Sequence, residues 1–99
     1  MDNDILNSVD ILARATGSSQ ISWSDIPNTS CLTAEYLHSR FIICKYTFKE
    51  NNKSVISFSF LDENNSIAGK INEYHEGESE FEKLNSLYEL ASRHILQTA

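Results

Sequence analysis

The stretch from residue 40 to 74 alternates apolar and polar side chains, and this pattern restricts the possible fold more than any other feature. It predicts strands over 40–49, 54–62 and 67–74, because successive side chains of a strand point to opposite faces of a sheet. Asparagine-rich segments at 50–53 and 63–66 separate the three runs, and short connections of this kind join neighbouring antiparallel strands. We therefore expect these strands to form an antiparallel meander.

The alternation also predicts which side chains share a face. The first strand places on its apolar face Ile42, Cys44, Tyr46 and Phe48, and on the other face Lys45, Thr47 and Lys49. The second strand places inside Ile56, Phe58 and Phe60, and outside Ser57 and Ser59. In the third strand Ile67, Gly69 and Ile71 alternate with Lys70 and Asn72.

Two weaker strands and a helix precede the meander. Residues 20–24 alternate apolar and polar side chains, and the segment with Pro27 ends this strand. Residues 32–37 place Leu32, Ala34 and Tyr36 on one side. Apolar residues spaced by three and four predict a helix over 4–16, whose stripe is Ile5, Leu6, Val9, Leu12, Ala13 and Thr16. Asp2, Asn3 or Asp4 can cap its start, and Gly17 can close its end in the left-handed conformation.

A second helix is predicted from Glu80 to about Gln97. Ser79 and Glu82 have the spacing of a capping box, and the apolar stripe consists of Phe81, Leu84, Leu87, Tyr88, Ala91 and Ile95. Leu90 and Leu96 fall outside this stripe. Because a sheet with one apolar face needs a cover, the chain predicts a two-layer α+β fold in the order α-β-β-β-β-β-α, forming a single domain over 1–99.

The charge of the chain is unbalanced. Its 14 acidic and 8 basic residues give a net charge of −6, which disfavours direct binding to nucleic acid or to an anionic membrane. No stretch approaches the length of a membrane span, and the acidic start differs from the basic start of a signal peptide. We therefore expect a cytoplasmic protein.

The chain contains two cysteines, Cys31 and Cys44. They are too few for a four-thiolate zinc site, and a disulfide between them is possible but not needed in a chain of this size. The favoured interpretation is that both are buried free thiols, since free cysteine is among the most buried residue types.

Four groups of residues carry a family resemblance. They are Leu12-Ala13-Arg14-Ala15-Thr16-Gly17, then Ile21 and Trp23, then Phe58 with Phe60-Leu61-Asp62, and finally Leu84, Leu87, Tyr88, Ala91 and Arg93. Together they resemble a group of small, poorly characterised bacterial domains that occur alone or beside signalling and conflict-system proteins. Ser92 departs from the pattern, in which a second basic residue stands beside Arg93. The resemblance implies a bacterial source and a role in defence, counter-defence or regulation, and it transfers no catalytic residue.

An acidic segment, defined here as residues 73–82, is the densest candidate site. It contains five glutamates, Glu73, Glu76, Glu78, Glu80 and Glu82, with His75 among them. Such a cluster can attract a basic protein partner or mimic a nucleic-acid backbone, or it can be a solvated loop followed by a helix start that favours glutamate. A metal site at His75, Glu76 and Glu78 is disfavoured because Gly77 alone does not make a calcium loop. No metal or cofactor is expected.

Trp23 is the second candidate for partner binding. Tryptophan is enriched among residues that dominate binding energy, but a ring that covers one end of a small core is the more common role. Tyr36, Tyr74 and Tyr88 have the same two interpretations, and the stripe assigns Tyr88 to the core.

Catalysis is not indicated. His38, His75 and His94 lie in separate segments, and none forms a recognisable motif with a cysteine or a serine. We expect a non-enzymatic interaction module that docks a basic or strand-presenting protein through Glu73, Glu76, Glu78, Glu80 and Trp23. The alternative is a small-ligand sensor that uses the space between sheet and helices, and a homodimer through Leu90 and Leu96 or through an edge strand remains open.

Overall fold

Two helices flank five strands in the computed structural model, which describes residues 3–64 and 66–98, with side chains over 7–64, 66–69 and 71–96. The elements are α1 (Asn3–Gly17), β1 (Ser22–Asp25), β2 (Cys31–Tyr36), β3 (Ser39–Thr47), β4 (Ser54–Leu61), β5 (Ile67–His75) and α2 (Ser79–Thr98). Their order and type confirm the predicted α+β arrangement, with bounds that differ by a few residues.

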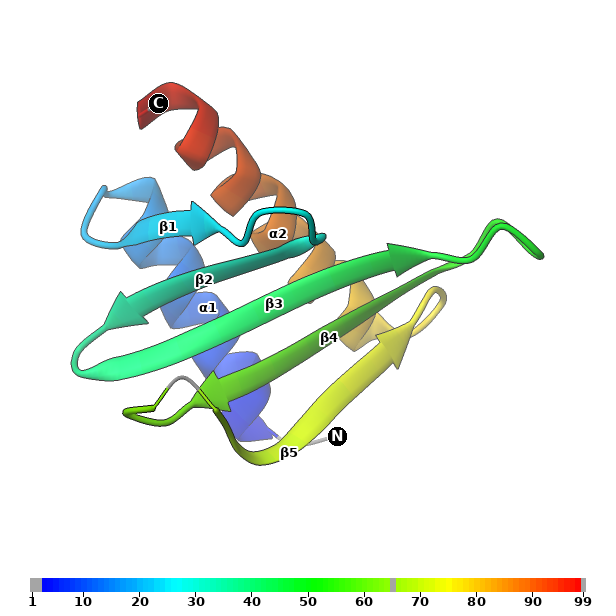
Figure 1. Ribbon diagram of the computed structural model, residues 1–99, viewed down its shortest axis with the longest axis horizontal. Helices are drawn as coiled ribbons and strands as arrows, with labels where there is room; N and C mark the ends of the chain where they lie inside the picture. The colour runs from blue at the N-terminus through cyan, green and yellow to red at the C-terminus, as the bar shows by residue number, and fades with distance from the viewer. Residues whose placement is uncertain (1–2, 65, 99) are drawn as a thin grey trace.

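The strands form one antiparallel sheet in the order β1-β2-β3-β4-β5, so every strand pairs with its neighbour in sequence. Both helices lie on the same side of this sheet, and the opposite side, here called the outer face, has no helix over it (Figure 1). The predicted meander is confirmed and extends to all five strands.

The core lies between the sheet and the two helices. α1 contributes Val9, Leu12 and Ala15, and α2 contributes Phe81, Leu84, Leu87 and Ala91. The sheet contributes Trp23, Leu32, Ala34, Phe41, Ile43, Ile56, Phe58 and Tyr74. The side chains of Ile5 and Leu6, predicted for the same stripe of α1, lie outside the described residues.

The predicted face of β3 is wrong. Phe41 and Ile43 point into the core, where the Phe41 ring lies 6.0 Å from that of Phe58 and 5.3 Å from that of Phe60. Residues 41–44 are apolar on both faces, so the alternation of β3 alone does not select its inner face. Pairing selects it, because Ile43 stands opposite both Leu32 and Phe58. Ile42, Cys44 and Tyr46 therefore lie on the outer face.

In β5, too, the residues predicted for the apolar face are not the buried ones. Its register with β4 shifts between Ala68, which pairs with Phe60, and Asn72, which pairs with Phe58. Gly69 has a φ of 83° within this irregular segment. Ile67 and Ile71 are about half exposed, at 46% and 50%, and Tyr74 takes the buried place opposite Ile56. In β4 the predicted inner residues Ile56 and Phe58 are confirmed.

Two predicted helix ends differ in detail. α1 closes through Ser19, whose φ is 60°, while the N–H of Gln20 donates to the Ala15 carbonyl and that of Ser19 to the Thr16 carbonyl. This is a Schellman motif with serine at the left-handed position, where Gly17 was expected to serve. At the start of α2 the predicted capping box is wrong, because the N–H of Glu82 donates to the Glu78 carbonyl, and the Ser79 hydroxyl donates to the Glu80 carboxylate at 2.9 Å.

A two-residue turn joins β2 to β3. Tyr36 pairs with Ser39, and the intervening Leu37 and His38 have φ values of 51° and 67°. Positive φ at both central residues is the signature of a type I′ hairpin turn, which normally holds Asn-Gly or a similar pair. The sequence gives no hint of this turn, because neither leucine nor histidine is a residue that it favours.

Candidate interaction surfaces

Two glutamates of the acidic segment bind backbone groups. The N–H of Ser54, at the start of β4, donates to the Glu76 carboxylate at 2.7 Å, and the N–H of Glu76 donates to the Ser54 carbonyl. The N–H of His75 donates to the Glu78 carboxylate at 2.7 Å, and the N–H of Glu78 donates back to the His75 carbonyl. Glu76 and Glu78 therefore hold the loop between β5 and α2 in place.

These bonds also protect part of the sheet edge. Glu76 is the bonded partner of Ser54, and bonded positions alternate along an antiparallel pair, so the backbone groups of Glu73 and His75 point away from β4. Glu78 satisfies both groups of His75 on this free edge. The last residue of β5 is thus already paired with the chain itself.

The other glutamates of the segment are directed toward solvent. Glu73 and Glu82 are exposed, and Glu80 is partly exposed beside the first turn of α2. The backbone N–H of Glu80 itself and the Ser79 hydroxyl hold the pKa of the Glu80 carboxyl below its ordinary value of 4.5. Among the described side chains the ion pairs are Arg40–Glu35 and Lys83–Asp10, so neither involves this segment.

Trp23 lies in the core rather than on the surface. Only 5% of it is exposed, and its indole N–H donates to the Thr16 hydroxyl at 2.8 Å, while that hydroxyl donates to the Leu12 carbonyl at 2.7 Å. The ring therefore holds β1 on α1. This is the core-covering role, the more common of the two roles considered for Trp23. What β1 offers a partner is its free backbone edge. Because Ile26 bonds to Cys31, the outward groups belong to Trp23 and Asp25.

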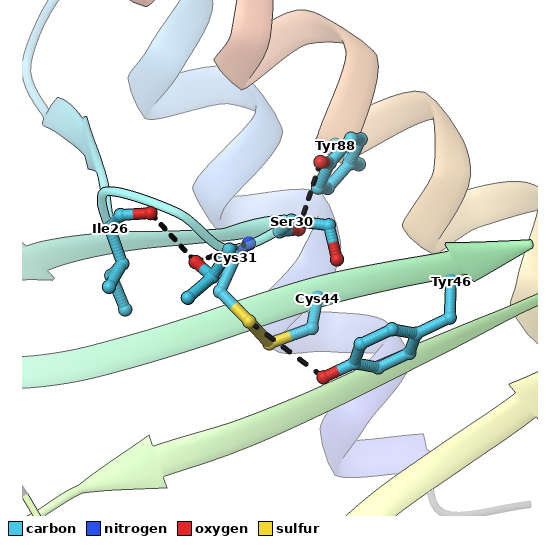
Figure 2. Close-up of a disulfide and its surroundings, with 7 residues drawn as sticks. Ile26, Ser30, Cys31, Cys44, Tyr46 and Tyr88 are labelled. Atoms are coloured by element: carbon cyan, nitrogen blue, oxygen red, sulfur yellow. Dashed lines mark hydrogen bonds between the residues drawn. A yellow bond between two sulfur atoms is a disulfide. The ribbon is translucent and has the colours of Figure 1, made fainter.

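Cys31 and Cys44 form a disulfide on the outer face, which corrects the interpretation as free thiols (Figure 2). The two residues stand directly opposite each other on β2 and β3, with Cα atoms 4.1 Å apart. Because the N–H of Lys45 donates to the Ser30 carbonyl, Cys31 and Cys44 occupy a non-hydrogen-bonded pair, where opposite side chains come closest. The expected burial of both is confirmed.

The segment before Cys31 is fixed to the last helix. The Tyr88 hydroxyl donates to the Ser30 carbonyl at 2.9 Å (Figure 2). The Thr29 hydroxyl donates to the Ile26 carbonyl at 2.7 Å. Burial raises the pKa of the Tyr88 phenol above its ordinary value of 10.0. The Tyr46 hydroxyl lies 3.9 Å from the Cys31 sulfur on the outer face.

The three histidines do not meet. His38 lies in the β2–β3 turn, His75 ends β5 and His94 lies on α2. Within the described part of the chain no three His, Cys, Asp or Glu side chains come together in a way that could hold a metal ion.

Buried side chains fill the space between sheet and helices, which the ligand-sensor alternative requires to be open. Hollows lie on the surface of the sheet and at its rim. One of about 470 Å³ lies on the outer face of β1, β2 and β3, lined by Ser22, Ser24, Thr33, Glu35, Arg40 and Ile42. A smaller one of about 190 Å³ lies at the rim between α1 and the β2–β3 turn.

Of the two leucines outside the stripe of α2, Leu90 is partly buried and Leu96 is 77% exposed. Over the described residues neither helix is long and apolar enough to cross a membrane. No family model matches the chain, and comparison with curated proteins and with solved structures finds no significant match. The resemblance to small bacterial domains therefore stays a prediction.

Proposed function

We propose that the protein is a non-enzymatic interaction module whose acidic segment docks a basic surface of a protein partner. The observation that carries this proposal is the separation of roles within the segment. Glu76 and Glu78 fix the loop through backbone bonds, while Glu73, Glu80 and Glu82 present carboxylates to solvent. Charges held in a fixed arrangement accelerate encounter with an oppositely charged patch.

The internal bonds change how the proposal is tested. Charge reversal of Glu76 or Glu78 would disturb the loop as well as its charge. The informative variant is therefore Glu73→Lys with Glu82→Lys, because both side chains are exposed. A matched control is Glu50→Lys with Glu89→Lys, which makes the same change in net charge at exposed positions outside the segment.

The experiment captures partners from the source cell, identifies them by mass spectrometry and measures association rates with the purified partner. We expect the rate to fall about tenfold or more in the Glu73→Lys, Glu82→Lys variant and also with added salt, while the control variant changes little. Equal loss in both variants would show that only net charge matters and would contradict a specific acidic surface.

A strand-presenting partner belongs to the same proposal. It would pair with the free edge of β1 through the outward backbone groups of Trp23 and Asp25, and the Trp23 ring would remain in the core. Strand addition depends on main-chain bonds, so this form of docking would be insensitive to salt.

The roles in defence, counter-defence or regulation, and the cytoplasmic location, are part of the proposal as well. The disulfide argues against the location, because structural disulfides are rare in the cytosol. Trapping thiols by alkylation in acid-quenched cells tests it. Free thiols at Cys31 and Cys44 would support a reducing compartment, and a bonded pair would contradict it.

A further inference from the structure

An apolar patch surrounds the turn between β2 and β3, at the end of the sheet opposite to the acidic segment. Leu37 projects from the turn with 76% of its surface exposed, and Ile11 on α1 is 49% exposed beside it. Both line the hollow of about 190 Å³ at the rim of α1, together with the partly buried Tyr36 and Phe60. We call Ile11, Tyr36, Leu37 and Phe60 the tip patch.

The backbone conformation of the β2–β3 turn is unfavourable for the two residues that it holds. Leu37 and His38 both adopt positive φ, which costs a residue with a side chain much more than it costs glycine. A turn of this kind is satisfied by Asn-Gly, yet the chain places here a large apolar side chain that is exposed. Strained residues of this kind are concentrated at functional sites, where the side chain has a use that offsets the strain.

The surroundings of the tip patch are acidic. A neighbouring hollow of about 560 Å³ is lined by the carboxylates of Glu35, Asp62 and Glu63. His38 and Arg40 also line it, so three carboxylates stand against one arginine. The chain as a whole carries −6, which disfavours a second copy as the occupant. An apolar anchor site with an acidic rim fits a segment that has an apolar side chain flanked by lysine or arginine.

We propose that the tip patch is a docking site for a basic amphipathic peptide segment of a partner protein, with Leu37 and Ile11 as its apolar anchors. The proposal goes beyond the acidic segment and does not depend on it. The register places the two sites apart, since Tyr36 and Ser39 close one end of the sheet while Val55 and His75 pair at the other (Figure 1).

The decisive variant is Leu37→Asn with His38→Gly. It gives the turn its preferred residues and removes the anchor, so the protein should become more stable while it loses binding. Loss of folding therefore cannot explain loss of binding. Ile11→Asn tests the second anchor, and Leu96→Asn is the control, because Leu96 is an exposed leucine outside the patch.

The probe is a displayed library of random linear peptides, selected on the full chain, with binding of the selected peptides then measured in solution. We expect peptides with one apolar side chain between basic residues, whose affinity falls about tenfold or more in the Leu37→Asn, His38→Gly and Ile11→Asn variants. Leu96→Asn and the Glu73→Lys, Glu82→Lys variant should bind as the original chain does.

Three results would overturn the proposal. The first is that no peptide is enriched, and the second is that selected peptides bind the Leu37→Asn, His38→Gly variant unchanged. The third is a concentration-dependent dimer that this variant abolishes in sedimentation experiments, which would assign the patch to a second copy. Failure of Glu73→Lys, Glu82→Lys to affect partner capture would contradict only the acidic segment, so the two proposals fail separately.

Discussion

Thr16 shows how a buried polar side chain can be useful to a small core. Its hydroxyl accepts a bond from the Trp23 indole and donates one to Leu12, so the polar groups of both side chains are paired where water is excluded. The same contact joins α1 to β1, two elements that are otherwise separated by a turn. This pair thereby adds a hydrogen bond to the apolar packing that holds the first helix on the sheet.

We expect Trp23→Phe to lower the free energy of unfolding by about 1 kcal/mol, since it removes the hydrogen bond and keeps most of the ring. Thr16→Val should cost more, about 1–3 kcal/mol, because it leaves the indole N–H buried without an acceptor. A double-mutant cycle by urea unfolding measures the coupling. Additive single effects would show that the contact contributes nothing.

Tyr88 gives the protein a dependence on alkaline pH. Because burial raises the pKa of its phenol above 10.0, the folded state disfavours the phenolate that the unfolded chain forms more readily. Its stabilising effect is therefore complete below the unfolded pKa and is lost as pH rises through the folded pKa.

We expect Tyr88→Phe to lower the free energy of unfolding by about 1 kcal/mol at neutral pH, because the bond to Ser30 is lost. Above about pH 10 the variant should lose less stability than the original chain. Unfolding followed across this pH range in both proteins checks the prediction. Parallel curves would contradict the assignment of the alkaline loss to Tyr88.

At the scale of elements, the β2–β3 hairpin has a strained turn at one end and a disulfide at the other. Its turn holds Leu37 and His38 at positive φ, and at its other end the disulfide links Cys31 to Cys44. The two cysteines are separated by 13 positions, so the bond closes a loop that contains the whole turn. The disulfide lowers the conformational entropy of the unfolded chain, and this stabilisation offsets part of the free-energy cost of the strained turn.

Reduction of the disulfide should therefore lower the free energy of unfolding by about 3 kcal/mol. The measurement is urea unfolding with and without a dithiol reductant. The Cys31→Ala, Cys44→Ala variant serves as the control, because it should match the reduced protein and be insensitive to the reductant. Equal midpoints for the reduced and oxidised proteins would contradict the prediction.

The end of α1 offers a stabilising change. Ser19→Gly should raise the free energy of unfolding by up to about 1 kcal/mol, because glycine adopts the left-handed conformation without the steric cost of a side chain. Ser18→Gly is the matched control. It should not stabilise, since Ser18 has no positive φ and its hydroxyl bonds to Arg14. Thermal unfolding compares the two, and equal shifts would contradict this account.

The element types could be predicted from the sequence, because periodicity reports which face of each element is apolar. The face of β3 could not, since residues 41–44 are apolar throughout and only their partners on β2 and β4 decide the orientation. That decision also determines the position of Cys44 opposite Cys31, whereas the sequence analysis left the disulfide open as possible but not needed. The tip patch has no sequence signal, because Leu37 and His38 do not favour the turn that they form.

At the scale of the whole molecule, the two ends of the sheet differ. The β5–α2 loop and the β2–β3 turn lie at opposite ends of the sheet (Figure 1). The first end presents the acidic segment, whereas the second presents apolar side chains with an acidic rim. The surplus of carboxylates repels itself in the folded state and is more widely spaced in the unfolded chain. The fold therefore carries an electrostatic cost that depends on ionic strength.

We expect added sodium chloride to raise the unfolding temperature between about 0.01 M and about 0.15 M, where the screening length falls from about 30 Å to about 8 Å. Glu73→Gln with Glu82→Gln should reduce this dependence, and Lys53→Gln should increase it. Scanning calorimetry at several salt concentrations checks both. A flat response in the original protein would contradict the assumed repulsion.

The bonds of Glu78 to His75 bear on how the protein behaves when it is concentrated. A strand with open backbone groups on one side can recruit the same strand of another copy, and repetition of this step leads to fibrils. β5 is such a strand, and its last residue is already occupied by the carboxylate and the N–H that follow it in the chain. Glu78 thereby shortens the template on which fibrils could grow, in the same segment that presents charge to a partner.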